Sequence, residues 1–287
     1  MKRFAILIIL LFALPVKAQL SQELKKKTFI YKDSLQLDYY SLSQGFKTER
    51  PLLVLMHGGG FASDNHDRQQ EVDFCRQMAS HGYAVASINY RLTRKNDPFS
   101  CDCGTDEKMK SFVMGSEDLA AATTFLIGRD ELTFDRRKIV LVGSSAGAET
   151  VLHNAFMKDH YLFRHIPEIP VAGLISFSGA MVNSAYITAK NVVPVLLIHG
   201  KKDLLVPTGT APHHYCSEDS PGYLMLDGPE TLLHKMKDLN TSYIYAFDPE
   251  GGHEIADEAF LETTWVKKFV DQVITDGEFM QLTIQLP

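Results

Sequence analysis

Two short segments carry the residue types that nucleophilic catalysis requires. The first comprises Gly143, Ser144, Ser145, Ala146 and Gly147, between an apolar run and a stretch of helical pattern. A sharp strand-to-helix turn exposes a serine hydroxyl, and flanking glycines remove the Cβ atoms that would clash there. We therefore predict that Ser145 is a nucleophile, that Gly143 and Gly147 support its turn, and that Ser144 points elsewhere. A tight turn without a catalytic role is the alternative.

The second segment is His57, Gly58, Gly59 and Gly60, directly after an apolar run. Consecutive glycines let a backbone approach a ligand closely and turn its N–H groups toward developing negative charge. We predict that Gly59, Gly60 and Ala146 form an oxyanion hole, while His57 and Gly58 support the loop. A phosphate-binding loop is the competing interpretation, but the lysine that such loops carry does not follow.

Together the two motifs resemble those of the α/β-hydrolase family, in particular esterases and lipases with an HGGG oxyanion loop, of the hormone-sensitive-lipase-like or carbohydrate-esterase-like kind. The resemblance extends over residues 52–274. It implies an acid and a histidine, each after a strand, in the chain order Ser, Asp, His. Asp203 and His253 stand at these positions, and Asp248 is the reserve candidate for the acid.

The implied chemistry is acyl transfer through a covalent intermediate. His253 would take the proton as Ser145 attacks an ester carbonyl, and Asp203 would fix the tautomer of the imidazole. A water molecule activated by His253 would then hydrolyse the acyl-enzyme. This chemistry requires no metal and no organic cofactor.

A further resemblance is the turn of Asn89, Tyr90, Arg91 and Leu92, which is similar to the turn that supports the oxyanion loop in HGGG esterases. The continuation departs from the family, because an unrelated sequence with a Cys-Asp-Cys insertion follows. This departure leaves the subfamily and the substrate open.

The four cysteines are Cys75, Cys101, Cys103 and Cys216. In an exported protein they can form disulfides, whose pairing the sequence does not reveal. Cys75 lies in a helical segment and can simply be buried. A metal site at the Cys-Asp-Cys segment is the alternative, although the usual paired spacing of zinc ligands is missing.

The elements that would position these residues follow an alternating pattern. Buried strands are predicted at residues 52–56, 83–89, 138–142, 171–176, 193–199 and 243–247, and helices at 68–80, 117–127, 148–157 and 256–274. Such alternation predicts a mostly parallel sheet with helices on both faces. Residues 28–32 and 35–40 alternate apolar and polar side chains, which predicts an antiparallel N-terminal edge hairpin. We therefore expect an α/β fold of the α/β-hydrolase type.

Two polar segments interrupt this pattern, at about residues 93–112 and 205–228. Long insertions in a compact α/β domain usually carry function, so we place the substrate pocket between them. The tail, residues 277–287, yields no prediction.

The composition fits one folded domain over residues 19–287, with 45% hydrophobic and 22% charged residues. A net charge of −6 gives no basic surface for nucleic acid or for an anionic membrane. The expected partner is a small-molecule or carbohydrate ester, and the oligomeric state is open.

The first residues predict export. Lys2 and Arg3 precede an apolar run at residues 4–14, and Val16 and Ala18 suit a signal peptidase. The run is shorter than the roughly 18 residues that a membrane-spanning helix needs. We expect cleavage after Ala18, no stable membrane insertion afterwards, and a secreted or periplasmic protein. An uncleaved membrane anchor is the alternative.

Three classes of function fit these predictions. The first is ester hydrolysis, which includes removal of acetyl or feruloyl groups from carbohydrates and is what the resemblance favours. The second is a peptidase or amidase with the same triad, and the third is a non-catalytic binding module. A lipase is disfavoured, because neither predicted loop is apolar enough to form an interfacial surface.

Overall fold

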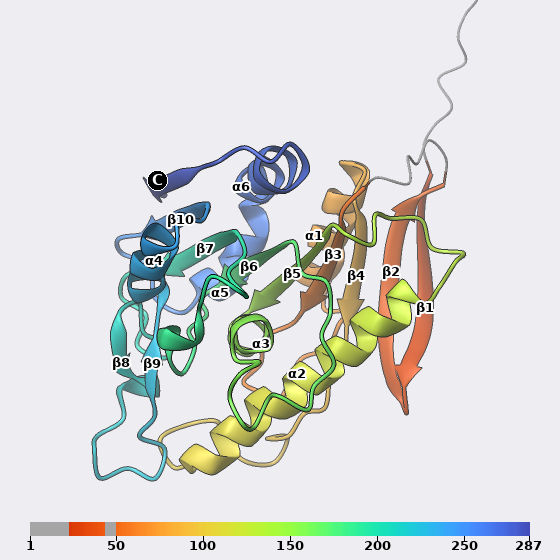
Figure 1. Cartoon of the computed structure of the whole chain (residues 1–287). Coiled ribbons are helices and arrows are strands. Elements are labelled where there is room, and N and C mark those ends of the chain that lie inside the picture. Colours follow the sequence, from red (N-terminus) through yellow and green to blue (C-terminus); the bar gives the residue numbers. More distant parts are fainter. Residues whose placement is uncertain (1–22, 44–49) are drawn as a thin grey trace, which may run out of the picture.

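A computed structural model describes residues 23–43 and 50–287 (Figure 1). The predicted leader, residues 1–18, lies outside the described residues. Among the residues that the structure does describe, no helix is long and apolar enough to cross a membrane.

The centre of the molecule is a nine-stranded sheet in the order β1-β2-β4-β3-β5-β6-β7-β10-β11. In chain order its strands are β1 (Leu24–Lys32), β2 (Leu35–Leu42), β3 (Leu52–Met56), β4 (Ala84–Ile88), β5 (Ile139–Ser144), β6 (Gly173–Phe177), β7 (Val195–Gly200), β10 (Tyr243–Asp248) and β11 (Gln281–Gln285). The pairs β1–β2 and β2–β4 are antiparallel, whereas all other neighbours are parallel. This confirms the predicted α/β-hydrolase architecture with an antiparallel N-terminal hairpin.

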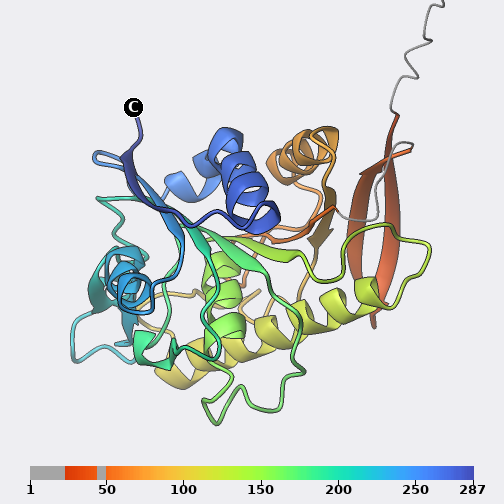
Figure 2. The same ribbon diagram turned by 45° about the horizontal axis from the view of Figure 1, so that its top comes forward.

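Each central strand is buried on both faces, because its alternate side chains enter two different cores. In β3, Leu52 and Val54 belong to one hydrophobic cluster, and Leu53 and Leu55 belong to the other. Side chains of α2 (Thr105–Ile127), α3 (Ala146–Phe156) and α4 (Pro229–Asp238) complete the first cluster. Those of α1 (Gln69–Ser80), α5 (Ile255–Glu258) and α6 (Thr263–Lys268) complete the second. Figure 2 shows these helices on opposite faces of the sheet.

The predicted loop at residues 93–112 is too long, because α2 already begins at Thr105. Gly104 precedes the helix, and Asp106 and Glu107 lie in its first turn, where acidic side chains interact favourably with the helix dipole. The polar composition of this first turn resembles that of a loop. Phe112, at the end of the predicted loop, is a buried core residue of α2.

The second insertion, residues 205–228, contains a small antiparallel sheet of β8 (Thr210–Pro212) and β9 (Met225–Asp227). The short 3-10 segment η2 (His213–Tyr215) lies between these strands.

The predicted final helix, residues 256–274, is interrupted. The chain forms α5 and a 3-10 turn, η3 (Ala259–Leu261), and Glu262 then leaves the helical region with ψ 40° before α6 begins. A π-helical segment, η4 (Phe269–Thr275), follows α6. The tail that yielded no prediction supplies β11, a parallel edge strand.

A disulfide between Cys101 and Cys216 joins the two insertions across 115 positions of the chain. Cys75 and Cys103 are buried thiols. Since Cys101 is bonded to another cysteine, the metal site considered for the Cys-Asp-Cys segment lacks one of its thiolates.

Replacing both Cys101 and Cys216 by serine is expected to lower the free energy of unfolding by about 2–4 kcal/mol, since the bond restricts the unfolded chain. Urea denaturation measures this. A reductant should lower the midpoint of the wild type to that of the double variant and leave the double variant unchanged. Equal midpoints without reductant would contradict the expectation.

Candidate active site

Ser145 occupies the turn between β5 and α3 with φ 50° and ψ −118°. Positive φ is uncommon for a residue with a side chain and marks a sharp, strained turn. A Cβ on Gly143 would lie 2.3 Å from the Gly147 carbonyl oxygen, and one on Gly147 would lie 2.2 Å from that of Met56. The two predicted glycines therefore permit a backbone contact that no larger residue could make.

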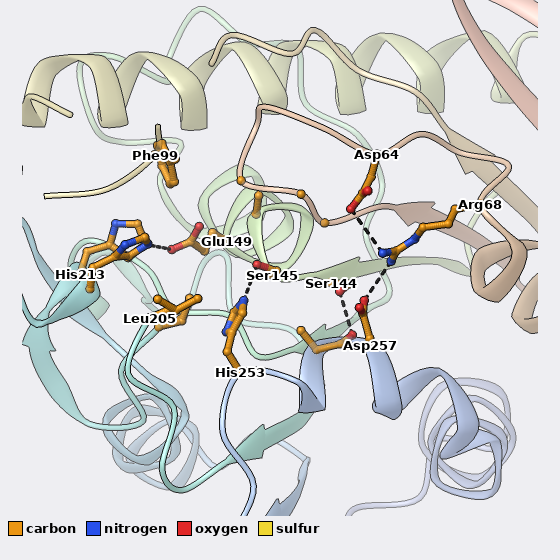
Figure 3. Close-up of a pocket in the computed structure, with 17 residues that line it drawn as sticks. Asp64, Arg68, Phe99, Ser144, Ser145, Glu149, Leu205, His213, His253 and Asp257 are labelled. Carbon is orange, nitrogen blue, oxygen red and sulfur yellow. Dashed lines mark hydrogen bonds and ion pairs between the residues drawn. The ribbon is translucent and has the colours of Figure 1, made fainter. Parts of the chain in front are cut away.

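The structure brings the three predicted triad residues together. Ser145 Oγ lies 2.8 Å from Nε2 of His253, and Nδ1 of the same ring lies 2.8 Å from Oδ2 of Asp203. Figure 3 shows His253 directed at the Ser145 hydroxyl. Ser144, as predicted, points elsewhere, and its hydroxyl donates to the carbonyl of Ala256 at 2.8 Å.

Asp203 is 1% exposed and its carboxylate accepts hydrogen bonds on both oxygens. Oδ1 accepts from the backbone N–H groups of Leu205 and Val206, at 2.8 and 2.9 Å. Oδ2 faces His253 and also lies 3.1 Å from Nε2 of His199. Burial alone would raise the pKa of Asp203, but the hydrogen bonds from His199 and His253 outweigh it, and the pKa lies well below its usual range.

Asp248, the reserve candidate, has a different task. Its Oδ1 accepts from the N–H groups of Glu250 and Gly251, which shapes the turn that leads to His253. The structure therefore favours Asp203 as the acid.

His199 is the residue that the sequence analysis left without a role. It is 1% exposed at the end of β7, and its Nε2 lies 3.0 Å from the carbonyl oxygen of Val206 as well as near Asp203. A histidine four residues before the acid, at the end of a buried strand, was the signal that could have revealed it.

The predicted oxyanion loop follows β3. Gly59 and Gly60 have φ values of 91° and 59°, in the region that favours glycine. Within the described chain, no group accepts a hydrogen bond from the N–H of Gly59, Gly60 or Ala146. Three unengaged donors near the nucleophile are what an oxyanion hole requires.

His57 and Tyr90 hold this loop from behind. Their rings stack with centroids 4.3 Å apart, and His57 Nδ1 lies 2.9 Å from the carbonyl oxygen of Gly58. The Tyr90 hydroxyl donates to the same oxygen at 2.7 Å. The supporting roles predicted for His57 and for the turn at residues 89–92 agree with this geometry.

Residues 37–179 match the model of the BD-FAE family. The match contains the oxyanion loop and the serine turn, and it ends before Asp203 and His253. Together with the order of the strands, this match supports the α/β-hydrolase fold.

Two plant proteins share shorter stretches with this chain. The 3-O-acetylpapaveroxine carboxylesterase CXE1 of Papaver somniferum is 30% identical over 105 residues, which cover 36% of this chain and 32% of that enzyme. Probable carboxylesterase 11 of Arabidopsis thaliana is 36% identical over 66 residues, or 22% of this chain and 14% of that protein. The chain thus matches a third or less of the length of either relative.

Solved structures confirm the fold over a longer range. The butyrate-bound esterase Est2 of Thermogutta terrifontis has a TM-score of 0.62 at 17% identity, with 87% of this chain and 95% of that chain covered. Esterase B from Lactobacillus Rhamnosis has a TM-score of 0.58 at 15% identity, with 88% and 87% covered.

A cavity of about 250 Å³ opens beside Ser145. At one end lie Glu149, His213, Phe99 and Leu205, and at the other Asp64, Arg68 and Asp257 (Figure 3). Phe99 and Leu205 come from the two predicted insertions, so the pocket is placed as the sequence analysis expected.

Replacing His199 by alanine is expected to lower kcat/KM about 10- to 100-fold, because the ionised Asp203 loses one of its donors. Ester hydrolysis assays measure the change, and circular dichroism verifies the fold. His165→Ala, at an exposed histidine, is the matched control. Equal activity of the two variants would show that His199 does not help to position the acid.

Buried histidines make the stability of the protein pH-dependent. Burial lowers the pKa of His57 and of His153 from 6.5 to about 4. Between pH 6.5 and about pH 4, each of these two imidazoles binds a proton in the unfolded chain but not in the folded chain. The stabilisation is therefore present above pH 6.5 and is lost as the pH falls toward 4.

The expected slope is about 1.4 kcal/mol per pH unit for each such histidine. Urea unfolding between pH 7 and pH 4.5 measures it. His57→Gln should make the slope shallower by about one proton, whereas His234→Gln, at an exposed residue, should leave it unchanged. If His57→Gln did not alter the slope, the lowered pKa of His57 would not contribute to the pH dependence of stability, and this prediction would be wrong.

Proposed function

We propose that this protein is a serine hydrolase that cleaves carboxylic esters through an acyl-enzyme on Ser145. The observation that carries the proposal is the hydrogen-bonded series from Ser145 through His253 to Asp203, beside unengaged backbone donors. The names of the two plant relatives, both carboxylesterases, support the same class of reaction.

In the proposed reaction Ser145 Oγ attacks the ester carbonyl while His253 Nε2 accepts its proton. Ionised Asp203 holds Nδ1–H of His253 in place and stabilises the imidazolium that forms. The carbonyl oxygen becomes negatively charged and would accept hydrogen bonds from Gly59, Gly60 and Ala146. His253 then protonates the leaving alcohol and next activates the water that releases the acid.

The proposed substrates are esters of short acyl groups, carbohydrate esters among them. A cavity of about 250 Å³ is smaller than most pockets for drug-sized ligands, which span about 300–1,000 Å³. The match to the BD-FAE family supports carbohydrate esters as substrates. The acetyl ester in the poppy enzyme's name supports a short acyl group.

We also propose that the protein is exported. Disulfides persist in oxidising compartments, and the Cys101–Cys216 bond suits such a location. Together with the predicted leader, it favours the periplasm or the cell exterior.

A fluorophosphonate should label the wild type at Ser145 and should not label Ser145→Ala. The same variant should lose at least about 10⁴-fold in kcat/KM with p-nitrophenyl acetate, because the other hydroxyl of the turn, that of Ser144, donates to the carbonyl of Ala256 instead. Ser144→Ala is the matched control and should still be labelled.

An unlabelled wild type would refute the proposed function. p-Nitrophenyl butyrate and octanoate test the acyl length, and acetate or butyrate is expected to be preferred over octanoate. Faster cleavage of an aminoacyl p-nitroanilide than of the esters would favour the peptidase alternative.

A further inference from the structure

Two buried polar side chains at one end of the pocket take no part in the proposed acyl transfer. Glu149 lies on α3 one helical turn after Ser145, so both side chains leave the same side of the helix. Its Oε1 lies 3.3 Å from Nε2 of His213, and each side chain is 1% exposed. Figure 3 shows the two groups facing each other beside Ser145.

This pair does not satisfy its own hydrogen-bonding capacity. Oε1 of Glu149 faces Nε2 of His213 at 3.3 Å, but the two atoms do not form a hydrogen bond. Oε1 and Nδ1 of His213 are both buried, and neither has a hydrogen-bond partner among the described residues. Leaving a buried polar group unpaired costs about 1–3 kcal/mol, so such groups in native proteins require an explanation. Both residues line the cavity beside Ser145, so a polar group of a bound ligand could supply the missing hydrogen bonds and would explain why these atoms are unpaired.

Burial disfavours the charged form of both groups. Burial raises the pKa of Glu149 well above its usual range, against the influence of nearby Lys108. Burial also lowers the pKa of His213 well below its usual range. The Lys108 ammonium donates to the carbonyl of Gly222 at 2.7 Å. A neutral carboxyl and a neutral imidazole can each donate and accept, which suits a hydroxyl better than an ion.

Two apolar side chains and a second histidine, His214, surround the pair; the ring centroids of His213 and His214 lie 4.2 Å apart. The ring centroid of Phe99 lies 5.2 Å from that of His213, and Leu205 lines the same end of the cavity. After His213, two residues with side chains, His214 and Tyr215, have φ values of 57° and 50°. Strained backbone of this kind persists where the surrounding structure fixes it, and it is frequent at ligand-binding sites.

We propose that Glu149 and His213 form a subsite that binds a hydroxyl group of the ester, carried a few bonds from the carbonyl that Ser145 attacks. This inference rests on the proposed function and narrows its substrate class. The hydroxyl belongs either to the acyl chain, as in a hydroxyacyl ester, or to the alcohol, as in a polyol monoester. The chemistry at the subsite is the same for both sources.

Two matched substrate pairs test the inference on the full-length wild type. The acyl pair is p-nitrophenyl butyrate and p-nitrophenyl 3-hydroxybutyrate, and the alcohol pair is propyl acetate and 3-hydroxypropyl acetate, followed by pH-stat. In one pair kcat/KM should be at least about tenfold higher for the hydroxylated ester, and that pair identifies the source of the hydroxyl.

Equal values within both pairs would overturn the inference, even though hydrolysis of the plain esters would still support the proposed function. Failure to hydrolyse any of the four esters, together with no fluorophosphonate labelling, would instead refute the proposed function itself.

Variants then assign the preference to the pair. Glu149→Leu and His213→Phe should each bring the ratio of the two kcat/KM values close to one, whereas Glu149→Gln, which can still donate and accept, should retain most of it. Glu131→Gln, at an exposed carboxylate outside the pocket, is the control.

The ratio is compared within each enzyme, so a general loss of activity does not affect it. If one of the apolar variants fails to fold, the other decides. A ratio that persists in a folded Glu149→Leu or His213→Phe variant would contradict the assignment.

Discussion

The arrangement of the site depends on one close backbone contact between the start of α3 and the end of β3. Gly147 lies so near the carbonyl oxygens of Met56 and His57 that a Cβ there would be 2.2 and 2.6 Å from them. On the loop side, a Cβ on Gly58 would lie 3.3 Å from Cβ of Ser145, so the glycine loop lies against the serine turn. The serine turn and the oxyanion loop are therefore a single packing unit, although about ninety residues separate them in the chain.

Two buried carboxyl groups near this unit have opposite properties. Asp203 receives hydrogen bonds on both oxygens, and its pKa lies below its usual range. Glu149 has an unpartnered oxygen, and burial raises its pKa. Hydrogen bonds to the charged form decide the first case and loss of water decides the second. Such differences let one site hold two carboxyl groups of which one favours its ionised form and the other its neutral form.

The sequence predicted most of the fold because the central strands are short, apolar and separated by helices. It also predicted that Ser145, Asp203 and His253 lie together, since each follows a buried strand in the family's order. It placed the start of α2 too late, because Asp106 and Glu107 give its first turn the composition of a loop. The pairing of Cys101 with Cys216 depends on which loops meet in space, and no local pattern encodes that. His199 did carry a local signal, its position four residues before Asp203 at the end of a buried strand.

The wide separation of the site residues along the chain also has a consequence for biosynthesis. A ribosome makes the chain from its N-terminus, so Ser145 and the glycine loop emerge well before Asp203, Cys216 and His253. During that interval the nascent chain has a serine with neither its acid nor its base, and one wall of its pocket is still unmade. The proposed acyl transfer would become possible only after residue 253 has been made, so a nascent chain that stops before it would be inert.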